Sequence, residues 1–164
     1  MRVFEWANLK RMVKNQLPSL TSLDRIVAVL NINASNWSVA VCDLRNKMFT
    51  YHDSSFVCGK HPYRDEFVAA MRRCLCDHAA ALDTAAHVVD NFEHVVGVAH
   101  WPLRNDGTHG FTPQQENSVD CGMFALACAS ACGSGLPLVY GQRDMKYLRR
   151  RLTLDLLSGD GSTS

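Results

Sequence analysis

The residue best suited to chemistry in this sequence is a cysteine at the junction of a polar run and an apolar one. Cys121 ends the turn-rich stretch 113–120 and is followed by Gly122 and the apolar stretch 123–132. We expect a helix to begin at this cysteine, because the free N–H groups and positive dipole end of a first turn favour a thiolate and can hold an oxyanion. Gly122 leaves room beside the sulfur, and Gln115 can supply a further amide donor.

Cysteine is also among the residue types most often buried for structural reasons, so the surroundings of each one matter. The chain has seven cysteines, an odd number, and several lie in apolar runs, which is typical of free thiols in a reducing compartment. Cys74 and Cys76 are too close together for a zinc knuckle, and no Cys/His pair follows at ligand spacing. We therefore expect no metal site and no cofactor, and expect Cys121 to be the most exposed and reactive thiol.

The segment around the cysteine resembles the active-site segment of the ubiquitin-like-protein-specific cysteine proteases of the Ulp/SENP type. The positions that carry the resemblance are Gln115, Asn117, Asp120, Cys121 and Gly122. It implies a thiol protease, a hydrolase that cleaves the peptide or isopeptide bond after the C-terminal Gly-Gly of a modifier such as SUMO. It also implies Cys121 as nucleophile, Asp53 as the residue that orients the base, and Gln115 as an oxyanion donor.

The same resemblance implies a His-Trp pair upstream of the aspartate, but this chain has Asn36-Trp37 there. An amide has no titration near neutral pH and cannot shuttle a proton, so Asn36 cannot act as the base. Three explanations stay open: an inactivating substitution, a natural pseudoprotease that binds modifiers without cutting, or a substitute histidine, either His52 or His100. Trp37 is implied to flank the tunnel for the Gly-Gly tail; without the family pattern, a core aromatic on a strand is an equal alternative.

Hydropathy patterns predict the elements that position these residues. Helices are expected at 4–13, 65–81, 123–132 and 145–156, and strands at 25–32, 37–42, 48–52 and 94–101, with a loop at 102–113. The first three strands form an antiparallel meander, so Asn36 and Asp53, at adjacent strand ends, should lie near each other. By strand alternation, His52 should face away from Asp53.

Two of the predicted helices differ in their surfaces. The helix at 65–81 is amphipathic, with Phe67 and Met71 on the sheet side and Arg72 in solvent, whereas the helix at 123–132 is apolar all round and should be buried. The arginine run 149–151 has the pattern of a solvated face.

Length and composition indicate one globular domain of 164 residues, 47% hydrophobic and 20% charged. The fold class expected is α+β, a papain-related cysteine-protease fold with a central, mainly antiparallel sheet and a buried helix opened by the cysteine. Residues 1–157 are expected to form this domain, without the family's N-terminal segment, and 158–164 a disordered tail.

The partners expected are a ubiquitin-like modifier, SUMO or a relative, and its conjugates. A net charge of +1 offers no basic field for nucleic acid. No stretch has the length of a membrane span or the pattern of a signal peptide, so we expect a soluble intracellular protein of the nucleus or cytoplasm.

Overall fold

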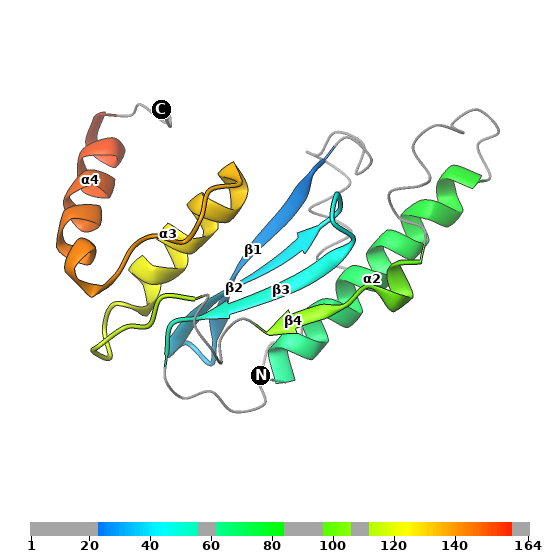
Figure 1. The fold of residues 1–164 in the computed structure, drawn as a ribbon, viewed down its shortest axis with the longest axis horizontal. Helices are drawn as coiled ribbons and strands as arrows, with labels where there is room; N and C mark the ends of the chain where they lie inside the picture. Colours follow the sequence, from blue (N-terminus) through cyan, green and yellow to red (C-terminus); the bar gives the residue numbers. More distant parts are fainter. Residues whose placement is uncertain (1–22, 56–61, 84–96, 106–111, 159–164) are drawn as a thin grey trace.

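The computed structural model describes residues 23–55, 62–83, 97–105 and 112–158, arranged in layers (Figure 1). A sheet lies between helix α2 on one face and helix α3 on the other, and α4 lies outside α3. The strands are β1 (Arg25–Ile32), β2 (Asn36–Asp43), β3 (Met48–Asp53) and β4 (Leu103–Asn105). The α-helices are α2 (Pro62–Asp83), α3 (Cys121–Ser134) and α4 (Met145–Ser158), and the short 3-10 helices are η3 (Val98–His100) and η4 (Gln142–Asp144).

The sheet has the order β1-β2-β3-β4, and the predicted antiparallel meander of its first three strands is confirmed. The turn between β1 and β2 uses positive φ angles at Asn33 (51°) and Ala34 (57°), the geometry that matches the twist of a tight hairpin. Ser38 of β2 pairs with Asp53 of β3, so Asn36, just beyond that pair, lies at the same end of the sheet as the aspartate.

Alternation along the strands divides the core between the two faces of the sheet. Ala40, Cys42, Phe49 and Tyr51 are in the same buried cluster as the α2 residues Phe67, Met71, Cys74 and Leu75. Val39 and Val41 pack on the other face with Ala125 and Cys128 of α3. Burial of a valine such as these contributes about 1.5–3 kcal/mol, so α3 is fixed to the sheet by apolar contacts beyond its first turn.

The strand predicted at 94–101 is wrong where the structure describes it. Gly97 has φ 73°, and the chain then forms η3 with Val98 and Trp101 buried and the residues between them exposed. Apolar residues three apart fit a 3-10 turn, in which such positions share a side. The strand comes later, as β4, inside the predicted loop; it pairs in parallel with β3, and Phe49 N–H donates to Pro102 O at 2.9 Å.

Two burial predictions also need correction. Arg72 does not face solvent: its Nη2 donates to Trp101 O at 2.8 Å, and its guanidinium lies over the Phe49 ring, 5.5 Å from the centroid. Helix α3 is not buried all round, because Leu126 is 45% exposed. The long aliphatic stem of an arginine and a helix covered on only two sides account for these differences.

The other helices agree with prediction, with small shifts of their ends. Gly135, φ 68°, ends α3 as expected, while Ser158, expected in the tail, is the last residue of α4. The helix predicted at 4–13 and the tail 159–164 lie outside the described residues. Within the described part of the chain, no helix combines the length and the apolar character that crossing a membrane requires.

Candidate functional site

Cys121 is the first residue of α3, as predicted from the sequence. Its thiol therefore lies at the end of the helix where backbone N–H groups are unpaired. The expectation that Cys121 is the most exposed cysteine is wrong, because the residue is only 8% exposed, whereas Cys76 is exposed and Cys132 half-buried. A reagent must therefore reach Cys121 through the surface around it rather than find it in open solvent.

A hydrogen-bond network around Asp120 holds the start of α3. Its carboxylate accepts hydrogen bonds from Arg149 at Oδ1, and from Asn117 Nδ2 at 2.7 Å and Gln142 Nε2 at 2.6 Å, both at Oδ2. Asn117 Oδ1 in turn accepts from the backbone N–H of Asp120 at 3.1 Å. The Arg149 hydrogen bond, followed by that of Asn117, holds the pKa of Asp120 below its usual range. The network ties the residue before the cysteine to η4 and α4.

The arginine run 149–151 is exposed, as predicted, but Arg149, whose side chain is 49% exposed, also has partners that the run did not indicate. Besides Asp120, its Nη2 reaches Val119 O at 3.4 Å. The pattern of the α4 helix alone gave no signal of this pair, because the partner lies in a loop distant in the sequence.

Asn36 and Asp53 are brought together as the meander predicted. The single Asn36 Nδ2 donates to both carboxylate oxygens of Asp53, at 3.1 Å to Oδ1 and 3.0 Å to Oδ2. The Ser55 backbone N–H also donates to Oδ1, at 2.8 Å. Asp53 is almost fully buried, so these hydrogen bonds replace water around its carboxylate. Among the side chains that the structure describes, the one that donates to the Asp53 carboxylate is thus the amide of Asn36.

Gln115 is a buried residue of the loop before α3, tied to the end of β3. Its Oε1 accepts from Ser54 Oγ at 2.9 Å, its backbone N–H donates to Ser54 O at 2.9 Å, and its Nε2 donates to Asn117 O. The neighbouring Gln114 donates from Nε2 to Asp53 O and to Thr112 O, both at 3.0 Å. Both side-chain amides therefore link the loop before α3 to the end of β3, Gln114 at Asp53 and Gln115 at Ser54. The Gln115 amide also contacts Asn117, which is nearer to α3 in the chain.

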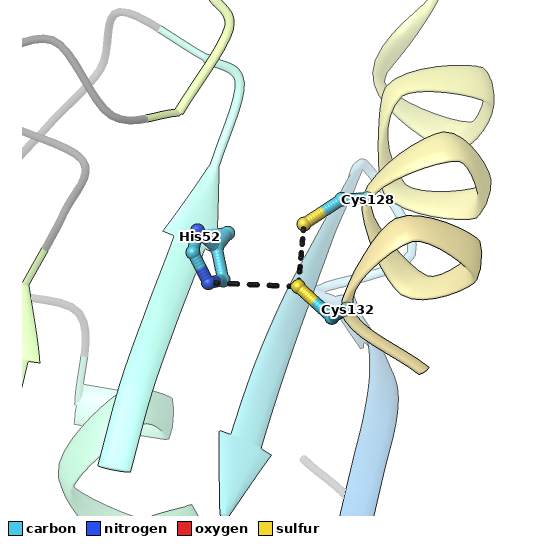
Figure 2. A group of neighbouring side chains, drawn as sticks. All are labelled: His52, Cys128 and Cys132. Carbon is cyan, nitrogen blue, oxygen red and sulfur yellow. Dashed lines mark hydrogen bonds between the residues drawn. The ribbon is translucent and has the colours of Figure 1, made fainter. Parts of the chain in front are cut away.

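Neither candidate histidine takes the place of the base beside Asp53. His52, buried on β3, points to the α3 side: its ring nitrogens lie 3.0 Å from Thr112 Oγ1 and Thr50 Oγ1, and Nε2 lies 4.0 Å from Cys132 Sγ (Figure 2). Adjacent strand residues point to opposite faces, as predicted for this pair. His100 is an exposed residue of η3.

A surface groove begins beside the cysteine. It has a volume of about 320 Å³ and is lined by Val29, Trp37, Val119, Gly122, Met123, Leu126 and Arg149. Trp37 is 39% exposed, so it is not the core aromatic that was the alternative. A Cβ at Gly122 would lie 3.5 Å from Trp37 Cδ1, so the missing side chain keeps the indole edge open next to the cysteine. The groove is mostly apolar, with one cation at its rim.

Comparison with known proteins identifies the family. Residues 5–159 match the Ulp1 protease family, C-terminal catalytic domain. The chain belongs to this family. The membership predicted from the segment around Cys121 is therefore confirmed.

Curated relatives in the Ulp1 family are longer than this chain. A putative ubiquitin-like-specific protease 1B of Arabidopsis thaliana is 29% identical over 84% of this chain and 36% of its own length. Ubiquitin-like-specific protease 1 of Saccharomyces cerevisiae is 25% identical over 88% of this chain and 20% of its own. The chain thus spans about a third or less of these two proteins.

Solved structures of Ulp1 share the fold. The C-terminal Ulp1 protease domain in complex with Smt3, the yeast ortholog of SUMO, matches with a TM-score of 0.71 at 20% identity, over 93% of this chain and 61% of that one. The SUMO protease Ulp1 with its catalytic cysteine oxidized to a sulfenic acid matches with a TM-score of 0.74 at 21% identity, over 94% and 62%. The expected α+β cysteine-protease fold is confirmed.

Proposed function

We propose that residues 1–157 form a cysteine-type peptidase domain that recognises the Gly-Gly tail of a ubiquitin-like modifier, SUMO or a relative, and acts on its precursors and conjugates. The observation that carries the proposal is the arrangement of Cys121 at the start of α3 beside the Trp37 groove. Two glycines have no side chains, so such a tail can lie flat against an indole and pass above Gly122. The groove would hold the tail with its last carbonyl at the thiol.

In this proposal the residues divide the work of acyl transfer. The Cys121 sulfur attacks the carbonyl carbon after the second glycine, and the oxygen, which becomes negative, is held by the Cys121 backbone N–H and the Gln115 amide. The Gln115 NH₂ has two hydrogens, of which one is donated to Asn117 O in the structure, so the other would be the one that holds the oxygen. The thiol proton must pass to a base and then to the departing amine, and Asp53 would orient that base.

The second candidate is a pseudoprotease that binds modifiers without cutting them. The observation that favours it is the Asn36–Asp53 pair, in which the amide donates to both carboxylate oxygens. Such a pair preserves the geometry of the site but cannot accept the thiol proton. Turnover would then depend on the small fraction of thiolate that the cysteine keeps unaided.

The two candidates are separated by Asn36→His, with Asn36→Gln as the matched control that adds bulk but no titrating group. Cleavage of a panel of modifier precursors is measured with each, alongside binding of the intact modifier by calorimetry. We expect a nearly silent native chain, no gain in Asn36→Gln, and a gain of roughly 10²- to 10⁴-fold in Asn36→His, the range that a general base supplies.

Each outcome assigns the site differently. Rescue that disappears on adding Cys121→Ser supports the peptidase site. Binding without cleavage in every variant supports the pseudoprotease. Full cleavage by the native chain would refute the role given to Asn36, and His52→Ala and His100→Ala would then identify the base. If no variant either binds or cleaves a modifier, both candidates are refuted.

A further inference from the structure

A cluster of three possible metal ligands lies on the α3 face of the sheet, separate from the Asn36–Asp53 pair. Figure 2 shows His52 of β3 facing Cys128 and Cys132, whose thiols project from successive turns of α3 toward the sheet. Cys132 Sγ lies 3.9 Å from Cys128 Sγ and 4.0 Å from His52 Nε2, and one ligand atom from each residue lies within 4.8 Å of the other two. The packing of α3 on the sheet therefore places three potential ligand atoms, two sulfurs and one imidazole nitrogen, close together.

These spacings match the ligand shell of a metal ion. In a tetrahedral site with bonds of about 2.3 Å to sulfur and about 2.0 Å to nitrogen, two thiolates lie about 3.8 Å apart and a thiolate and an imidazole nitrogen about 3.6 Å apart. The observed distances are close to these, 3.9 Å between the two sulfurs and 4.0 Å between Cys132 Sγ and His52 Nε2. Rotation of the His52 ring and of the two cysteine χ1 angles would shorten the third distance, between His52 and Cys128, which is within 4.8 Å.

A disulfide is a poorer use of the two cysteines. Side chains at i and i+4 of a helix have Cβ atoms roughly 5–6 Å apart, whereas a disulfide needs them within about 4.5 Å. The same separation is ordinary for two ligands of one ion, as in helical i, i+4 metal motifs. The helix therefore presents both sulfurs to a common partner more readily than to each other.

The surroundings also suit a ligating imidazole. A metal at Nε2 leaves the proton on Nδ1, and Thr112 Oγ1, 3.0 Å away, can accept it. A cavity of about 10 Å³ beside His52 and Cys128 is close to the smallest space that holds one water molecule, a possible further ligand.

We propose that His52, Cys128 and Cys132 form a binding site for a thiophilic d10 cation, Zn²⁺ or Cu⁺. Thiolate and imidazole ligands are those that these two ions prefer. The proposal departs from the sequence-based expectation of no metal site. The histidine and the cysteines come from elements far apart in the chain, so they form no ligand motif that can be recognised in the sequence. The ion would join β3, which ends at Asp53, to the helix that begins at Cys121, so the site goes beyond the proposed peptidase function and does not depend on it.

The test titrates the reduced, chelator-treated chain anaerobically with Zn²⁺ and with Cu⁺ against competing chromophoric chelators, and with Co²⁺ as a spectroscopic probe. We expect one equivalent of metal, a thiolate-to-cobalt charge-transfer band with the intensity of two thiolates, and a melting temperature that rises with metal concentration. Cys132→Ser and Cys128→Ser should lower affinity by more than 100-fold and remove that intensity in part. Cys76→Ser and Cys121→Ser, matched controls outside the cluster, should bind as the native chain does.

Two conservative variants test the imidazole without removing a ligand. Thr112→Val removes the acceptor for Nδ1–H and should weaken binding by about 10-fold, in the range for loss of an outer partner of a metal ligand. Thr50→Val removes a hydroxyl that competes for Nε2 at 3.0 Å, so it should leave affinity unchanged or raise it. A merely structural role of the two threonines would weaken binding in both variants.

A readout on the native chain covers variants that fail to fold. Bound metal should slow alkylation of Cys132, mapped by mass spectrometry, while exposed Cys76 reacts at the same rate with and without metal. Tight binding of Zn²⁺ alone or of Cu⁺ alone supports the site and names its ion. Absence of binding by both ions, or binding that Cys128→Ser and Cys132→Ser leave intact, overturns the proposal.

Discussion

Replacing Asp120 by asparagine should loosen the start of α3 without altering any residue proposed to touch substrate. The carboxylate accepts side-chain hydrogen bonds at both oxygens, from Arg149 on one side and from Asn117 and Gln142 on the other. An asparagine must turn its NH₂ toward one of these groups of donors. At least one charge-assisted hydrogen bond is then lost and a donor faces a donor.

The expected magnitude follows from those contacts. A hydrogen bond to a charged group contributes roughly 1.5–3 kcal/mol, and the Arg149 side chain is 49% exposed, so screening places the loss toward the lower end, about 2 kcal/mol. For a chain of this size, each kcal/mol lowers the melting temperature by about 2–4 °C, so Asp120→Asn should lower it by about 4–8 °C. The assay is thermal unfolding followed by circular dichroism.

The matched control is Asp155→Asn on α4. Asp155 accepts from Arg151 Nε at 3.1 Å, but both side chains are about half exposed, so its loss should shift the melting temperature much less. A shift for Asp120→Asn no larger than that for Asp155→Asn would refute the role given to the network.

The pH dependence provides the second half of this test. The pKa of Asp120 is lower in the folded chain than in the unfolded one, so the unfolded state takes up its proton first as the pH falls. The stabilisation is therefore complete above the ordinary aspartate pKa of about 4 and is lost as the pH drops through the lower folded value. The difference between native and Asp120→Asn should shrink in that window, and a difference that grows there would contradict the assignment.

Two further predictions concern the proposed substrate site. Gln115→Ala should lower any measurable turnover by on the order of 10²- to 10³-fold, best measured in the Asn36→His background; unchanged turnover there would remove Gln115 from the oxyanion site. Gly122→Ala should raise the melting temperature slightly, because alanine is favoured over glycine in a helix by about 1 kcal/mol. It should nevertheless weaken modifier binding, because the added Cβ would lie 3.5 Å from Trp37 Cδ1 and cover that edge of the indole. Equal affinity of the two proteins by calorimetry would show that the tail does not cross this point.

Elements with local causes were predictable from the sequence. The meander of β1, β2 and β3 follows from apolar runs separated by turn residues, and its register is enough to bring Asn36 to Asp53. The start of α3 at Cys121 follows from the change from polar to apolar residues. In each case the signal and the structure occupy neighbouring positions in the chain.

Features that depend on partners distant in sequence were not predictable in this way. The periodicity of α4 placed Arg149 on an exposed face, where it lies, but contains no information about its pair with Asp120. The helix pattern of α3 treated Cys128 and Cys132 as core without reference to His52. The parallel strand β4 is three residues long, too short for alternation to distinguish it from a loop, and only its pairing with β3 defines it.

The pair of Asn36 and Asp53 shows how an amide meets the hydrogen-bonding needs of a buried aspartate. A buried carboxylate requires donors, and Asn36 Nδ2 spans both oxygens of Asp53 while Ser55 N–H donates to one of them. A neutral histidine offers a single N–H to the same carboxylate. Asparagine thus meets the structural demand of Asp53 at least as well as histidine would.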